Sequence, residues 1–209
     1  MQTGHPKSWL IVRVTLAAIL LSVAFNKPVV SQSSPSQPYD LYLPLVTHGF
    51  APLPAIQNGD FELGDNGDWT VYSSSGYYLI QEENLPPGLD PRSGTWLAWL
   101  GGVPNEDSRI SRGLTLPAGG PVYLRYYYQV DSSDQVSCTR DWMVFLVGTT
   151  QLASMGLCEA ANTLSWTPGT VNLSAYAGQV ITVTFQVTTS LTGVGSSFFI
   201  DDVSLVRTP

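Results

Sequence analysis

Two acidic motifs lie at opposite ends of a stretch rich in strand-forming residues. Asn58-Gly59-Asp60-Phe61-Glu62 opens this stretch, and Phe199-Ile200-Asp201-Asp202-Val203-Ser204-Leu205 closes it. A β-sandwich can bring its first and last strands side by side, which would place these carboxylates close together. Clustered carboxylate and carbonyl oxygens suit a hard cation such as calcium. The two motifs therefore predict an oxygen-rich site where the two ends of the stretch meet.

Aromatic side chains offer a second kind of binding chemistry, because sugar rings present C–H faces that can stack on Trp and Tyr. Residues 122–130 alternate in polarity, so their odd-numbered members should share one strand face, and the next strand begins with a Trp. If that face is open, it forms a platform for a glycan. The predicted ligand-binding residues are Tyr123, Arg125, Tyr127 and Trp142.

A second aromatic candidate is the predicted hairpin formed by residues 69–73 and 77–81 around a Ser-Ser-Gly turn. It carries Tyr72, Tyr77 and Tyr78. For both surfaces the alternative is that the aromatic residues belong to the core or to cross-strand pairs.

The sequence predicts no catalytic site. After a predicted signal peptide the only histidine is His48, which precedes the domain, and no Gly-x-Ser-x-Gly elbow is present. Glu82-Glu83 and Glu106-Asp107 are carboxylate pairs near Pro and Gly turns, and neighbours on a strand point apart rather than across a sugar. We expect both pairs to be solvated loop charge and the protein not to be an enzyme.

The elements that must position these residues read as strands. Short apolar runs recur roughly every ten residues with Gly, Pro, Asn or Ser at each break, which is typical of a two-sheet sandwich. Residues 142–147 are apolar on both faces, as in a central strand covered on both sides. No segment shows sustained helical periodicity. The predicted fold is all-β, a two-sheet antiparallel jelly-roll β-sandwich.

The N-terminus has the pattern of an export signal. Lys7 and Arg13 supply positive charge, and residues 14–25 form an apolar stretch that is short for a membrane span. We expect a signal peptide over residues 1–31, a linker over 32–54 and the jelly-roll domain over 55–209. An uncleaved N-terminal anchor is the alternative. With the signal removed, the protein should be secreted, with no remaining membrane span.

Charge and cysteine content fit an exported protein. Residues 32–209 contain six Arg, no Lys and all sixteen acidic residues, a formal net charge of −10. Such a chain should repel nucleic acid and anionic membranes. Cys138 and Cys158 are an even pair, which favours a disulfide in an oxidising compartment, although two buried thiols are the alternative.

Several short motifs together resemble the galactose-binding-like jelly rolls of bacterial extracellular proteins. That group includes non-catalytic carbohydrate-binding modules and accessory β-domains of secreted proteases. The motifs are Asn58 to Glu62 followed by Trp69, Ser93-Gly94 with residues 96–102, Asp141, Trp166 before residues 171–178, and Phe199 to Val203. The resemblance covers residues 57–206 and implies a fold, not a ligand.

By this resemblance, a structural calcium ion would tie the first strand to the last. Glu62 and Asp201 would supply carboxylate oxygens, and backbone carbonyls from Asn58 to Asp60 would complete the shell. Adjacent strand residues point to opposite faces, so only one of Asp201 and Asp202 should reach the ion, and Asp201 is favoured. The alternative is that Glu62 and Asp201 cap loops or pair with Arg.

The resulting hypothesis is a non-catalytic extracellular binding module for carbohydrate or cell-surface glycan. The alternative is a protein-interaction or adhesion module of the cell envelope or the secreted fraction, whose partner would be an extracellular protein.

Overall fold

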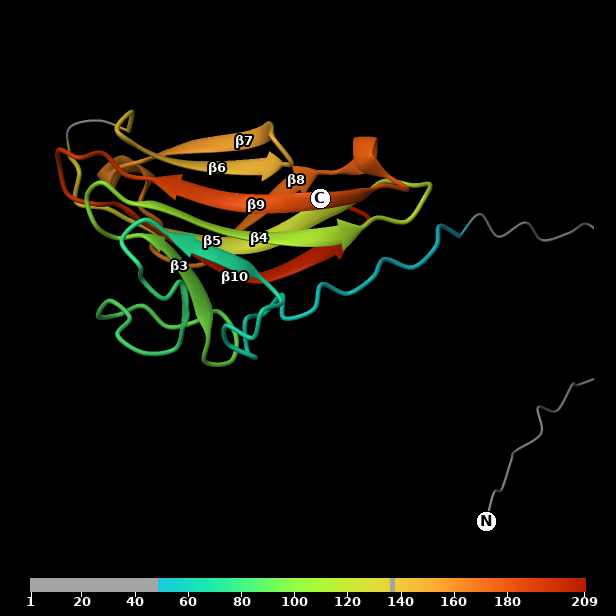
Figure 1. Ribbon diagram of the computed structural model, residues 1–209, viewed down its shortest axis with the longest axis horizontal. Coiled ribbons are helices and arrows are strands. Elements are labelled where there is room, and N and C mark those ends of the chain that lie inside the picture. Colours follow the sequence, from blue (N-terminus) through green and yellow to red (C-terminus); the bar gives the residue numbers. More distant parts are fainter. Residues whose placement is uncertain (1–48, 136–137) are drawn as a thin grey trace, which may run out of the picture. The chain divides into compact units, whose positions relative to one another are not determined.

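The computed structural model describes residues 49–135 and 138–209, which form ten β-strands and two 3-10 turns (Figure 1). The strands are β1 (Thr70–Ser73), β2 (Ile80–Gln81), β3 (Leu97–Gly101), β4 (Asp107–Thr115), β5 (Tyr123–Asp131), β6 (Asp141–Val147), β7 (Thr150–Leu157), β8 (Thr167–Asn172), β9 (Val180–Thr188) and β10 (Ser197–Val206). The turns are η1 (Glu159–Ala161) and η2 (Ser174–Tyr176). The predicted signal peptide and His48 lie outside the described residues. In the described ranges no helix has the length and apolar character needed to cross a membrane.

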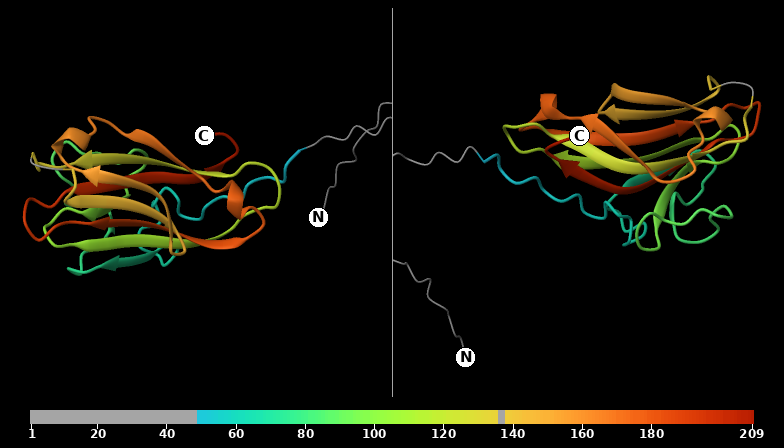
Figure 2. Two further views of the ribbon diagram at one scale, coloured as in Figure 1. Left: turned by 90° about the horizontal axis from the view of Figure 1, so that it is seen from above. Right: turned by 180° about the vertical axis from the view of Figure 1, so that it is seen from behind.

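The strands form two five-stranded antiparallel sheets packed face to face, as Figures 1 and 2 show. Sheet A has the order β1-β4-β9-β6-β7, and sheet B has the order β2-β3-β10-β5-β8. The last strand, β10, lies in the interior of sheet B between β3 and β5. The predicted all-β antiparallel jelly-roll sandwich is therefore confirmed.

The alternation in the sequence decides which side chains face the core. On β9, Ile181, Val183, Phe185 and Val187 are all buried, as their period of two predicts. On β6 the prediction was wrong: Met143 and Phe145 are buried, but Trp142 is 38% exposed. The outer face of this strand is therefore only partly covered, and its apolar residues lie on the surface of sheet A.

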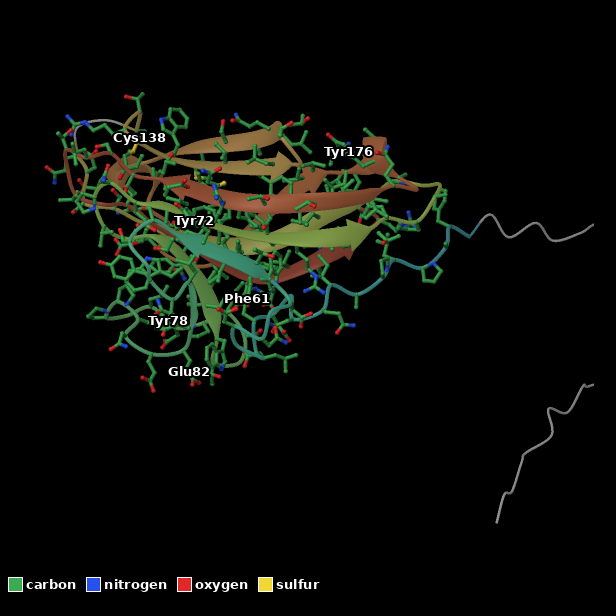
Figure 3. All side chains as sticks on the ribbon, in the orientation of Figure 1. Phe61, Tyr72, Tyr78, Glu82, Cys138 and Tyr176 are labelled. Atoms are coloured by element: carbon green, nitrogen blue, oxygen red, sulfur yellow. A yellow bond between two sulfur atoms is a disulfide. The ribbon has the colours of Figure 1, made fainter. Side chains whose placement is uncertain are left out.

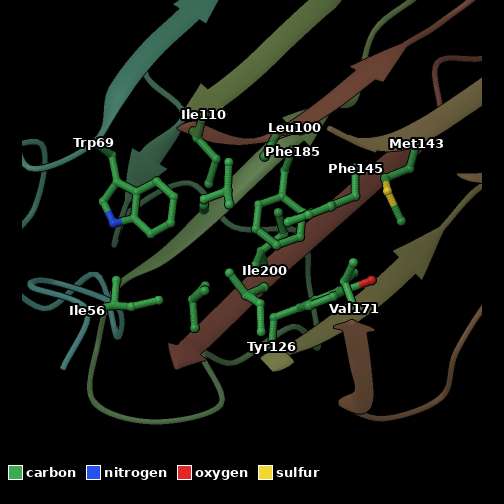
Figure 4. Packing of buried hydrophobic residues seen from close by; sticks show 14 of the residues in the cluster. Ile56, Trp69, Leu100, Ile110, Tyr126, Met143, Phe145, Val171, Phe185 and Ile200 are labelled. Atoms are coloured by element: carbon green, nitrogen blue, oxygen red, sulfur yellow. The ribbon is translucent and has the colours of Figure 1, made fainter. Parts of the chain in front are cut away.

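An aromatic cluster joins the two sheets at the centre of the core (Figure 4). The ring of Phe185 lies 4.8 Å from that of Tyr126 and 5.0 Å from that of Phe145, both in edge-on geometry. Such pairs add about 0.5–1.5 kcal/mol each to the free energy of burial. Burial, with a smaller effect of Tyr128, raises the pKa of Tyr126 to about 12, so its hydroxyl stays neutral.

The predicted hairpin over residues 69–81 is wrong. β1 pairs with β4 in sheet A, whereas β2 pairs with β3 in sheet B. The chain thus crosses from one sheet to the other after Ser73, through a turn closed by a hydrogen bond from Gly76 N to the Ser73 carbonyl oxygen of 3.2 Å.

The predicted disulfide is present between Cys138 and Cys158, with Cα atoms 4.8 Å apart. It connects the segment before β6 to the residue after β7. The pair therefore ties the two strands at the outer part of sheet A to one another at one end.

The folded unit begins upstream of residue 55. Leu53 packs against the core, and Arg207 donates hydrogen bonds to the carbonyl oxygens of Ala51 and Pro121. The Arg207 guanidinium also lies 5.3 Å from the ring centre of Phe50. The last residues of the predicted linker thus contact the domain in this structure.

Candidate functional site

The two acidic motifs meet in the structure. Val203 N donates to the Gly59 carbonyl oxygen at 2.7 Å, which fixes the first motif beside β10. A Cβ on Gly59 would lie 2.2 Å from the Val203 carbonyl oxygen, so only glycine permits this approach. The predicted convergence of the two ends of the domain is confirmed.

Glu62 and Asp201 both bind the loop before β3. The Glu62 carboxylate accepts hydrogen bonds of 2.9 Å from Thr95 N and from Trp96 N. Asp201 accepts bonds of 2.8 Å from Arg92 N and 3.2 Å from Ser93 N. The two carboxylates therefore cap consecutive parts of one loop, which is the arrangement that the sequence left as the alternative to a metal site.

Asp202 contacts the same loop as Asp201, although strand alternation predicted that the two side chains point to opposite faces. Its carboxylate accepts a bond of 2.9 Å from the Ser93 hydroxyl and forms an ion pair with Arg92. The reason is an irregularity of the β10 register between Asp201 and Ser204, together with a positive φ of 49° at Asp202. A bulge of this kind changes the direction of the side chain.

Asp201 is fully buried, and this burial raises its pKa to about 7. The charge of Asp202 acts in the same direction, and the backbone N–H donors of the loop act against it. A cation bound beside Asp201 would favour its ionised form and lower this pKa.

The other predicted metal ligands are less favourably placed. The Asn58 side chain closes its own turn, accepting from Leu63 N and donating to the Gly64 carbonyl oxygen, each at 2.9 Å. Asp60 is exposed. In residues 49–135 and 138–209 no three His, Cys, Asp or Glu side chains are grouped so that they could hold a metal ion. A calcium shell would therefore depend on Glu62, Asp201 and backbone carbonyls.

The predicted four-residue platform is wrong as a single surface. Tyr123, Arg125 and Tyr127 lie on the outer face of sheet B, whereas Trp142 lies on that of sheet A. The Arg92 guanidinium stacks on the Tyr127 ring at 3.4 Å. Arg125 and Tyr127, but not Tyr123, instead line a shallow groove of about 630 Å³ against the first acidic motif.

A separate cleft of about 370 Å³ lies between the chain that follows the Ser73–Gly76 turn and the end of β3. Its lining residues are Tyr77, Tyr78, Leu79, Gln81, Asn84, Trp99, Gly101, Gly102 and Val103. Two of the three hairpin tyrosines predicted to bind a ligand therefore line one cleft. Tyr72 does not, since it lies on β1 with Arg109 4.2 Å from its ring centre. Figure 3 shows Tyr78 on the loops that extend from the sandwich and Tyr72 on the strand.

Trp99 is the aromatic residue of this cleft that sequence reasoning missed. A Cβ on Gly102 would lie 2.9–3.0 Å from atoms of the Trp99 indole, so any side chain there would cover the ring. The indole Nε1 is buried and has no hydrogen-bond partner among the described residues. The Gly101-Gly102 doublet after a Trp-containing strand is the signal that could have identified this position.

Glu106 was expected to be a solvated loop charge, and this prediction is wrong, because its side chain is buried and the residue is only 2% exposed. Its carboxylate accepts bonds of 2.6 Å from the Ser73 hydroxyl, 3.0 Å from the Ser74 hydroxyl and 3.1 Å from Ser75 N. Burial alone would raise the pKa of Glu106, but these donors outweigh it and hold the pKa below its usual range. Glu82 and Glu83 are exposed, as predicted.

Solved structures share this fold at low sequence identity. TmCBM61, solved in complex with beta-1,4-galactotriose, is 20% identical over 73% of this chain and 97% of its own, with a TM-score of 0.50. The K1 and K3 cleaved adhesin domains of Lys-gingipain from Porphyromonas gingivalis are 14% and 15% identical, with TM-scores of 0.52 and 0.51. They align with 76% and 73% of this chain and 100% and 99% of their own.

No protein-family model and no curated protein matches the sequence. At these identities the shared feature is the jelly-roll fold, as the motifs in the sequence had led us to expect.

Proposed function

We propose that this protein is a non-catalytic extracellular binding module for carbohydrate, and that the glycan binds in the cleft formed by Tyr77, Tyr78 and Trp99. The observation that supports the proposal is an aromatic cleft whose lining carries no Asp, Glu, Lys, Arg or His among the described residues. Tyr77 and Tyr78 are 53% and 83% exposed, so their rings are available to a ligand.

The cleft has the chemistry that a neutral sugar needs. The C–H face of a pyranose ring stacks on the Tyr78 or Trp99 ring, and the side-chain amides of Gln81 and Asn84 can exchange hydrogen bonds with hydroxyl groups. The unpartnered Nε1 of Trp99 would be satisfied by a hydroxyl or ring oxygen that reaches the indole edge.

The same lining supports a binding role rather than hydrolysis. Glycoside hydrolysis uses two carboxylates about 5–9.5 Å apart across the scissile bond, and the residues that line the cleft contribute none. Glu106 is held behind the cleft wall by serine donors and is not part of the lining. The module would therefore retain a glycan without cleaving it.

The proposed extracellular localisation is supported by two features of the chain. The disulfide is the kind of bond that persists in an oxidising compartment, and residues 1–31 have the charge and apolar pattern of a signal peptide.

The experiment is calorimetric titration of the purified protein with trisaccharides of β-1,4-linked galactose, glucose, xylose and mannose. We expect saturable binding of at least one of these neutral sugars. The β-1,4-galactotriose arm is included because one solved structure of the same fold holds that sugar. No detectable binding to any member of a wider panel of neutral and charged glycans would overturn the proposal.

The second candidate function is a protein-interaction or adhesion module. Two structures of the same fold are adhesin domains, and the groove of about 630 Å³ on sheet B offers mixed charge from Arg125 and Asp202. This function is favoured if no glycan binds and if one extracellular protein copurifies with the wild-type protein but not with a variant that lacks the Arg125 side chain.

We also propose a structural calcium ion beside Glu62 and Asp201. The support is that two carboxylates from opposite ends of the domain approach the same loop and that one of them is fully buried. Bound calcium would supply the positive charge that offsets the desolvation of Asp201.

A further inference from the structure

Hydrogen bonds connect Glu106 to both walls of the aromatic cleft: the tyrosine wall, which begins at Tyr77, and the opposite wall, which includes Val103. On one side its carboxylate accepts the three hydrogen bonds from Ser73, Ser74 and Ser75. The Ser73 hydroxyl oxygen in turn accepts a bond of 3.0 Å from Tyr77 N, so the chain of contacts runs directly to the residue that begins the tyrosine wall.

The backbone of Glu106 reaches the opposite wall through one threonine. Glu106 N donates to the Thr189 hydroxyl oxygen at 2.8 Å, and Thr189 N donates to the Glu106 carbonyl oxygen at 2.9 Å. The same hydroxyl donates to the carbonyl oxygen of Val103, which lines the cleft, at 2.6 Å. One buried residue thus connects both walls through hydrogen bonds.

The buried charge of Glu106 depends on the serine turn. A carboxylate withdrawn from water loses solvation, and Glu106 forms no ion pair within 4.0 Å among the described residues, so its hydrogen bonds with the turn are what offset that loss. In return, the carboxylate holds three donors of an otherwise exposed serine turn in one geometry. A fixed turn lowers the conformational entropy that the tyrosine wall would lose on binding.

We propose that Glu106 is a positioning residue for the ligand: its buried carboxylate holds the Ser73–Tyr77 segment in the geometry that binds a glycan, without touching the glycan itself. This inference rests on the proposed function. It differs from a purely structural role, in which Glu106 would affect unfolding but not the affinity of the folded protein.

The test compares Glu106→Gln with a matched control, Asp68→Asn. Glutamine keeps the size of the side chain but replaces one acceptor oxygen by a donor, so a serine donor or Ser75 N–H loses its partner. Asp68 is a half-buried carboxylate that contacts Asn66 and Arg112, and it does not line the cleft. Each protein is titrated at 25 °C with the trisaccharide that the wild-type protein binds, and melting temperature and amide exchange at Ser75 and Tyr77 are recorded.

Glu106→Gln should weaken binding by roughly ten-fold while the protein remains folded at 25 °C. The reason is that a turn that is no longer preorganised loses more conformational entropy on binding, which lowers the affinity. Amide exchange at Ser75 and Tyr77 should accelerate. Asp68→Asn should change affinity by less than about two-fold. Ser73→Ala, which removes the contact to Tyr77 N, should reproduce part of the loss.

Two outcomes would overturn the inference. The first is a folded Glu106→Gln protein with wild-type affinity. The second is unchanged amide exchange at Ser75 and Tyr77, which would show that the turn does not depend on the carboxylate. If the wild-type protein binds no glycan, the proposed function fails, and the exchange experiment still decides whether Glu106 orders the turn.

Discussion

Removal of the Tyr78 ring is the sharpest test of the aromatic cleft. The side chain is 83% exposed, so Tyr78→Ala should change the free energy of unfolding by no more than about 0.5 kcal/mol. One ring face covered by a sugar removes on the order of 60 Å² of apolar surface from water, which at about 25 cal/mol/Å² corresponds to about 1.5 kcal/mol. Glycan affinity should therefore fall by about ten-fold.

The assay is calorimetric titration with the trisaccharide that the wild-type protein binds. Tyr72→Ala is the matched control, because Tyr72 is a 44% exposed tyrosine on the outer face of sheet A and does not line the cleft. Equal affinity of Tyr78→Ala and the wild-type protein would refute the cleft as the binding site. An equal loss in both variants would mean that the effect is not local to the cleft.

Four further outcomes are expected. The pKa of Glu106 is lowered in the folded protein, so the ionised carboxylate stabilises the fold above the unfolded pKa of about 4.3. This stabilisation is lost as the pH falls through the lower folded pKa. In urea unfolding experiments, Glu106→Gln should lack this acid-dependent loss of stability. Phe185→Ala should lower the free energy of unfolding by about 3–5 kcal/mol in urea titration, and a loss below about 1 kcal/mol would contradict the central role of its ring. Reduction of Cys138–Cys158, separated by 20 residues, should cost about 3 kcal/mol, with unfolding monitored by circular dichroism with and without reductant. Excess chelator should lower the melting temperature, since calcium at a hundred times its Kd stabilises by about 2.7 kcal/mol; an unchanged melting curve would count against the ion.

The parts of the fold that follow local rules could be predicted from the sequence. Alternation over residues 122–130 correctly separated the outer residues of β5 from the buried Leu124, Tyr126 and Val130, because a strand has a period of two whatever its neighbours are. The meeting of the two acidic motifs, observed as the hydrogen bond between Val203 and Gly59, was predicted because a jelly roll brings the two ends of the domain together.

The parts that failed depend on strand order and on contacts between distant residues. Trp142 was assigned to the wrong surface because neighbours in sequence, β5 and β6, lie in different sheets. Asp202 reaches its loop through a bulge that no spacing rule reveals. Glu106 is buried only because serines more than thirty residues upstream in the chain supply its donors.

The contacts of Arg207 have a practical consequence for how the domain is presented. Arg207 binds Ala51 close to the last residue of the chain, at the end of the sandwich where β4 finishes and β5 begins. The tyrosine cleft lies at the other end, where β1 finishes and β4 begins, as the direction of the strands in Figure 1 shows. A tether or affinity tag joined at either boundary of the described domain would therefore hold the domain by one end and leave the tyrosine cleft, the proposed glycan site, at the opposite end.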